Sequence, residues 1–94
     1  MTLDEFKSSL TQDSPPTGIS MPLQALWTDA KGDWDTAHRI AQSISDATGA
    51  WIHAYLHRRE GDLSNAAYWY SCAGKKRSNQ SLQEEWESIV QALL

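Results

Sequence analysis

Two histidines lie one helical turn apart in a segment whose apolar pattern predicts a helix. His53 and His57 have the i, i+4 spacing that places both imidazoles on one helix face, and Glu60 continues the same line of side chains. This spacing can chelate zinc or another transition metal. A third ligand would have to come from elsewhere, and His38 is the only other histidine. The sequence therefore allows two interpretations, a metal site formed by these histidines or a structural or solvated pair with no cofactor.

Motifs that would define an enzyme are absent. His53 is followed by Ala54 and Tyr55, so the histidine pair does not form the HExxH motif of metalloproteases. Cys72 has three histidines as possible bases, but no local signature positions an oxyanion hole. The glycines are scattered singly, and none forms a phosphate-binding loop. We expect a binding protein, and the alternative is a metal-binding or small enzymatic protein that uses His53 and His57.

Composition limits the class of protein and of partner. The chain has 94 residues, 40% of them hydrophobic and 21% charged, which indicates one folded domain. The net charge of -4 argues against a nucleic-acid partner, because such domains neutralise phosphates with basic residues. The only basic run, at residues 75–77, follows a predicted helix, where cations favour the exposed carbonyl groups of the last turn.

The cellular compartment follows from the lone cysteine and the N-terminal segment. Cys72 cannot form an intrachain disulfide, which fits a reducing compartment. Residues 1–10 contain no apolar run long enough for a signal peptide or a membrane span. We therefore expect a soluble, unprocessed, cytoplasmic protein with no membrane partner.

The elements that must position these residues are predicted to be helices throughout, which makes the fold class all-α. Thr2 and Glu5 have capping-box spacing before an amphipathic helix at 1–10. Residues 11–21 contain prolines and a glycine and are predicted to form a linker. Ser81 and Glu84 repeat the capping-box spacing, which predicts a C-terminal helix at 81–94 that caps a single domain spanning 22–94.

An internal repeat organises the middle of the chain. The segments Gly32-Asp33-Trp34 and Gly61-Asp62-Leu63 lie 29 residues apart, each between two helical patterns. The glycine can end one helix in the left-handed conformation, and the aspartate can cap the next helix. The predicted helices, at 22–31, 34–44, 50–60 and 63–74, would fold into two antiparallel hairpins with a break at Gly49.

These residues resemble the tetratricopeptide repeat (TPR) over residues 22–74. Its second helix follows a Gly-Asp turn and carries small and aromatic residues at fixed offsets, matched in the later unit by Gly61, Asp62, Ala66, Tyr70 and Ala73, with Ala54 at the small position of the first helix. The earlier unit matches at Gly32, Asp33, Ala37 and Ala25, but Ala41 replaces the aromatic residue and Ile44 a small one. The repeat is also 29 residues long instead of the family's 34 and lacks its closing proline.

The resemblance implies that the protein is an interaction module for a protein or peptide. In the TPR register, the concave groove is lined by Trp51, Tyr55, Arg58 and Arg59. Their rings would supply apolar contact, and their guanidinium groups would pair with acidic groups of the partner. The alternative is that the two rings belong to the core and the two arginines complement the helix C-terminus.

The TPR register and the apolar periodicity disagree about the histidines. The register directs His53 and His57 toward neighbouring helices, whereas the periodicity directs Trp51 and Tyr55 inward and the histidines to the opposite, polar side. For burial we follow the periodicity, because burying large rings removes more apolar area from water.

A second candidate surface lies on the outer side of the predicted 63–74 helix. Tyr68 and Cys72 point away from its alanine stripe, and Trp69 lies at the edge. These side chains are expected either to contact the first or last helix or to form a homodimer interface. Monomer and homodimer both remain open.

Overall fold

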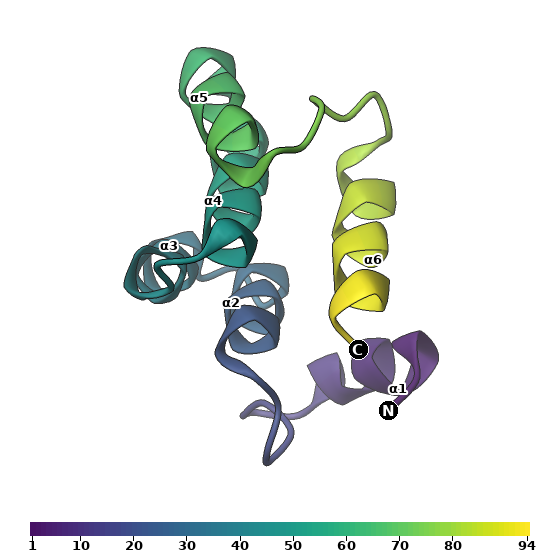
Figure 1. Ribbon diagram of the computed structural model, residues 1–94. Helices are drawn as coiled ribbons and strands as arrows, with labels where there is room; N and C mark the ends of the chain where they lie inside the picture. Colours follow the sequence, from purple (N-terminus) through teal and green to yellow (C-terminus); the bar gives the residue numbers. More distant parts are fainter.

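The computed structural model describes residues 1–94 and is all-helical, as the sequence predicts (Figure 1). The helices in chain order are α1 (Leu3–Ser8), α2 (Met21–Ala30), α3 (Trp34–Ser43), α4 (Ala47–Arg59), α5 (Leu63–Ala73) and α6 (Leu82–Leu93). A 3-10 turn at Ser9–Thr11 extends α1. None of these helices combines the length and apolar character that crossing a membrane requires.

The two Gly-Asp turns have the predicted geometry. Gly32 and Gly61 adopt φ values of 91° and 87°, the left-handed conformation in which a side chain would be strained. The Oδ1 atom of Asp33 accepts a hydrogen bond from the backbone N–H of Thr36 at 3.1 Å, and Asp62 caps α5 in the same way. The local sequence therefore determines where α3 and α5 begin.

The two capping boxes are also present. Thr2 and Glu5 satisfy each other's backbone N–H groups at the start of α1. Ser81 and Glu84 do the same at the start of α6. Between α1 and α2, Lys31 Nζ donates to the carbonyl oxygens of Leu10 and Gln12, and so fastens the start of the linker to the end of α2.

The predicted break at Gly49 is wrong, because this glycine lies in the first turn of α4. Asp46 is the N-cap, and its Oδ1 atom accepts hydrogen bonds from the N–H groups of Thr48 and Gly49 at 3.1 and 3.2 Å. A Cβ atom at position 49 would overlap the carbonyl oxygen of Ile44. The glycine is therefore explained by a close backbone approach within the α3–α4 connection rather than by a helix end.

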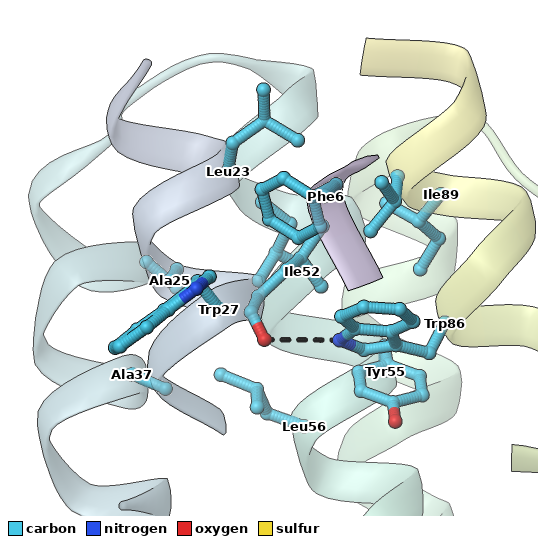
Figure 2. Close-up of a cluster of buried hydrophobic side chains, with 13 residues drawn as sticks. Phe6, Leu23, Ala25, Trp27, Ala37, Ile52, Tyr55, Leu56, Trp86 and Ile89 are labelled. Atoms are coloured by element: carbon cyan, nitrogen blue, oxygen red, sulfur yellow. Dashed lines mark hydrogen bonds between the residues drawn. The ribbon is translucent and has the colours of Figure 1, made fainter. Parts of the chain in front are cut away.

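Helix α4 is the centre of the molecule. It packs against α2, α3, α5 and α6, and every residue from Ile52 to His57 is buried. The main core lies between α4, α2 and α6, where Trp86 Nε1–H donates to the carbonyl oxygen of Leu26 at 2.9 Å (Figure 2). The Phe6 ring of α1 packs against Trp86 with ring centroids 5.8 Å apart.

The C-terminal helix α6 packs along α2 and α4 and against α1, and Tyr70 of α5 donates a hydrogen bond to its Glu85. In Figure 1, α6 stands on the opposite side of α4 from α3. One side of α4 is therefore covered by the C-terminal part of the same chain.

A candidate metal centre between α3, α4 and α5

The fold brings all three histidines of the chain together. His38 comes from α3, whereas His53 and His57 come from successive turns of α4. The Nε2 atoms of His38 and His53 are 2.7 Å apart, and one potential ligand nitrogen from each of the three rings lies within 4.8 Å of the other two. The candidate that the sequence left unplaced, His38, is thus next to the predicted pair.

Small residues on α3 allow this approach. Ala37 and Ala41 are 0% and 1% exposed. Small side chains at a helix contact let the two axes approach closely. His38 lies beside these alanines on α3, and its imidazole contacts the ring of His53 on α4.

The predicted exposure of the histidine pair is wrong. His53 and His57 are 4% and 6% exposed, and His38 is half-buried. Periodicity within α4 could not show this, because α4 is enclosed on several sides and has no solvated polar face. The TPR register, which directs these two positions toward neighbouring helices, agrees better with the structure.

Two tryptophans cover the histidine rings. Trp34 stacks on His38 with ring centroids 4.8 Å apart, and Trp69 stacks on His53 at 3.9 Å. The indole N–H of Trp34 donates to the carbonyl oxygen of Leu56 at 2.8 Å, which fixes this ring against α4. The contact of Trp34 with His38 could have been predicted from the sequence, because the two residues have i, i+4 spacing. The contact of Trp69 with His53 could not, because it depends on how α5 packs.

His57 has different partners at its two ring nitrogens. Its Nδ1 atom lies 2.8 Å from Glu60 Oε1, and its Nε2 atom lies 3.4 Å from the side-chain amide nitrogen of Asn65. When the carboxylate accepts the Nδ1–H proton, the other nitrogen, Nε2, keeps its lone pair, toward which the Asn65 amide donates. Metal-ligating histidines commonly have such a partner, which orients the ring and raises its basicity.

The surroundings favour the neutral form of the other two imidazoles. Burial, together with the neighbouring His38 and His57, lowers the pKa of His53 to about 4. Burial and the adjacent His57 also lower the pKa of His38. Both rings therefore keep unprotonated nitrogens at neutral pH, and the neutral imidazole is the form that ligates metals.

The spacing of two of the nitrogens, those of His38 and His53, fits an ion after a small adjustment. Two nitrogens bound tetrahedrally to zinc at 2.0–2.1 Å are about 3.3 Å apart. The Nε2 atoms of His38 and His53, at 2.7 Å, must therefore move apart by about half an ångström. Three imidazoles suit zinc, copper, nickel or cobalt.

Comparisons of the chain with protein-family models, with curated proteins and with solved structures give no match.

The arginines of the predicted partner surface are engaged within the chain. Arg58 Nη1 lies 2.8 Å from Glu85 Oε1 of α6, and Arg58 also donates to the carbonyl oxygen of Gln80. Arg59 Nε lies 3.3 Å from Oδ1 of the buried Asp29 of α2. Both guanidinium groups therefore pair with acids of this protein.

The two rings of that predicted surface are covered as well. Tyr55 is 1% exposed and belongs to the main core, in agreement with the alternative that the sequence left open. Trp51 is half-buried, and Lys75 Nζ lies 4.3 Å from the centre of its ring. Much of the face that the TPR register assigns to a partner is thus covered by residues 75–93.

The outer side of α5 is open. Tyr68 is 61% exposed and Cys72 is exposed, so neither is covered by the first or last helix, contrary to one expectation. Trp69 instead turns inward, toward His53. These three neighbours on α5 therefore do not form one surface.

Proposed function

We propose that this protein binds one transition-metal ion, with zinc the leading candidate, through His38, His53 and His57. The observation that supports the proposal is the convergence of three imidazoles from two helices, with potential ligand nitrogens within 4.8 Å of one another. Imidazole nitrogen is a preferred ligand of zinc, nickel and copper.

A purely structural role would not require this arrangement. Burial costs an imidazole hydration, and apolar side chains of similar size would fill the same space without that cost. The chain instead places all of its histidines in one cluster and adds a carboxylate, Glu60, at the Nδ1 atom of His57. This combination of ligands and an orienting carboxylate is typical of metal sites.

The expected effect of the ion is to link α3 to α4. The three residues hold the ion from two helices that the chain connects by only three residues, 44–46. An ion that binds the folded chain and not the unfolded one raises the free energy of unfolding in proportion to the logarithm of its concentration. The protein is therefore expected to be more stable when loaded with metal.

The test is a zinc titration of protein freed of metal by a chelator. We expect one equivalent of zinc by calorimetry and a higher thermal midpoint, and both should be lost in His53→Phe, whose ring can still stack on Trp69. Absence of saturable zinc, nickel, cobalt and copper binding by a folded wild-type protein would reject the proposal. A His53→Phe variant that keeps the same stoichiometry and affinity would also reject this site.

We further propose that α2–α5 form two antiparallel, TPR-like hairpins. The Gly-Asp turns and the contacts of α2 with α3, α3 with α4 and α4 with α5 support it. Binding of a protein or peptide in the groove receives less support, because residues of the groove register contact the chain's own C-terminal part.

A further inference from the structure

Asp29, near the C-terminal end of α2, is a buried carboxylate without a hydrogen-bond donor. It is 1% exposed, and its two oxygens are the only buried side-chain atoms of the protein that make no hydrogen bond. The Arg59 guanidinium and the Tyr55 hydroxyl favour its charged form, but neither is aligned to donate to it. Burial outweighs both and raises the pKa of the Asp29 carboxyl. A carboxylate in such a place is costly until a donor reaches it.

A cavity of about 150 Å³ adjoins this carboxylate. Its walls combine three buried residues with three exposed ones, namely Asp29, Tyr55 and Trp86, and Ala30, Arg59 and Gln83. The cavity therefore leads from solvent to the buried carboxylate. A cavity of this volume admits a molecule of about the size of benzene.

The chemistry of the walls indicates the class of molecule that fits. The buried carboxylate disfavours an anion, and a neutral apolar molecule would leave its oxygens without donors. An alkylammonium ion supplies three N–H donors and the opposite charge. Leu10, Ala30 and Trp86 provide apolar surface for its carbon atoms. The amide nitrogen of Gln83 donates to Glu87, which leaves the amide oxygen as a further acceptor.

The neighbouring guanidinium does not close the site. The Arg59 side chain is 43% exposed, and its Nε atom lies 3.3 Å from Oδ1 of Asp29 without the alignment of a hydrogen bond. An ion pair with an exposed cation typically contributes about 0.2 to 1 kcal/mol, whereas a hydrogen bond to a charged group contributes about 1.5 to 3 kcal/mol. An ammonium group that donates directly to Asp29 can therefore displace this guanidinium toward solvent.

We propose that this cavity binds the ammonium end of a small aliphatic amine, with the ammonium group on Asp29 and the carbon chain against Trp86 and Leu10. The site is separate from the histidine cluster and requires no metal ion. It therefore adds a second ligand, of a different class, to the proposed metal binding.

The test is a titration of metal-free protein with n-butylamine at pH 7, followed by two-dimensional NMR of the backbone and indole N–H groups. Absence of metal prevents the amine from binding an ion at the histidine cluster. We expect saturable shifts that include the indole N–H of Trp86, which donates to the carbonyl oxygen of Leu26. 1-Butanol has the same shape without the charge and should bind at least about tenfold more weakly.

Two variants and a matched control locate the ammonium group. Asp29→Asn should weaken butylamine binding by about tenfold or more and leave butanol binding unchanged, because the amide keeps the shape and removes the charge. Asp35→Asn makes the same change at an exposed position of α3 outside the cavity and should bind butylamine as the wild type does. Arg59→Gln removes the competing cation and should strengthen butylamine binding about threefold. This variant also provides the test if Asp29→Asn does not fold.

A blocked lysine, Nα-acetyl-lysine methylamide, identifies the source of the amine. Binding as tight as that of butylamine assigns the site to a lysine side chain of a partner, and clearly weaker binding assigns it to a free amine. The proposal is overturned if the folded wild-type protein shows no saturable butylamine binding or binds 1-butanol equally tightly. It is also overturned if neither Asp29→Asn nor Arg59→Gln changes the affinity. Zinc binding by the histidines is independent of all these results.

Discussion

His38 on α3 and His53 on α4 face each other with their Nε2 atoms 2.7 Å apart. At this distance one neutral ring donates a hydrogen bond and the other accepts it. An ion bound by both nitrogens must replace that hydrogen bond, and the donor ring must carry its proton on Nδ1 instead of Nε2. The same contact therefore links α3 to α4 in the metal-free protein and places two ligands next to each other for an ion.

Acidification should destabilise the metal-free protein through His53. Its pKa is about 4 in the folded chain and near 6.5 in an unfolded chain, so the unfolded state binds more protons between these values. The free energy of unfolding contributed by His53 is fully present above pH 6.5 and falls as the pH is lowered toward 4, by up to roughly 3 kcal/mol. His38 acts in the same direction, because its pKa is also lowered.

Urea unfolding at pH 7 and pH 4.5, in the presence of a chelator, measures this effect. The control is His53→Phe, which removes the proton-binding group but keeps a ring against Trp69. Asp29 contributes with the opposite sign, because burial raises its pKa, and comparison with the control isolates His53 from it. Equal pH dependence in wild type and His53→Phe would contradict the prediction.

Glu60→Gln should weaken metal binding without removing a ligand. The carboxylate accepts a hydrogen bond from His57 Nδ1 at 2.8 Å, and loss of such a partner typically costs about 10- to 100-fold in metal affinity. Because Glu60 is exposed, the thermal midpoint of the metal-free protein should change little. The measurement is zinc affinity by competition with a chromogenic chelator.

Asp13→Asn is the matched control for that variant, since it removes an exposed carboxylate from the linker. We expect its zinc affinity to equal that of the wild type. If Glu60→Gln also binds zinc as tightly as wild type, the carboxylate does not orient His57.

Local sequence patterns predicted the two Gly-Asp turns correctly. The features that were missed depend on contacts between distant parts of the chain. Asp33 and Asp62 cap helices through bonds that span three residues, so a short stretch of sequence contains the whole interaction. The prediction of a helix break at Gly49 was wrong because this glycine is required by the close approach of the Ile44 backbone. That approach depends on the path of the α3–α4 connection, which the local sequence does not show. A glycine that ends a helix and a glycine that admits a neighbour look alike in sequence.

The candidate site was predictable in its residue types and not in its surroundings. The i, i+4 spacing of His53 and His57 identified two candidate ligands, and the scarcity of histidine left only His38 as a candidate third. Their burial depends on α3 and α5 packing on the same side of α4, which the pattern within one helix does not contain. The stacking of Trp69 on His53 has the same origin.

Gly49→Ala should destabilise the fold more than Gly61→Ala. The methyl group at position 49 overlaps the backbone of Ile44, and a backbone atom cannot move aside as a side chain can, so we expect a loss of about 3 kcal/mol. At position 61 nothing lies within 4 Å of the added Cβ atom, and the cost is only that of the left-handed conformation, about 1 to 2 kcal/mol. Chemical denaturation of both variants checks the order, and a larger loss in Gly61→Ala would contradict it.

Arg58→Ala should be strongly destabilising, because it leaves a buried carboxylate without its charged partner. Glu85 is 3% exposed and accepts hydrogen bonds from Arg58 of α4 and Tyr70 of α5. Removal of one partner of a buried ion pair costs about 3 to 5 kcal/mol, and the lower end applies here because Arg58 is partly exposed. The double variant Arg58→Ala with Glu85→Gln should lose clearly less than the sum of the two single variants, since the neutral amide no longer needs the guanidinium. Urea unfolding of the four proteins in this cycle gives the coupling energy. A coupling near zero would show that the contact between α4 and α6 depends on the apolar core around Trp86 and not on this ion pair.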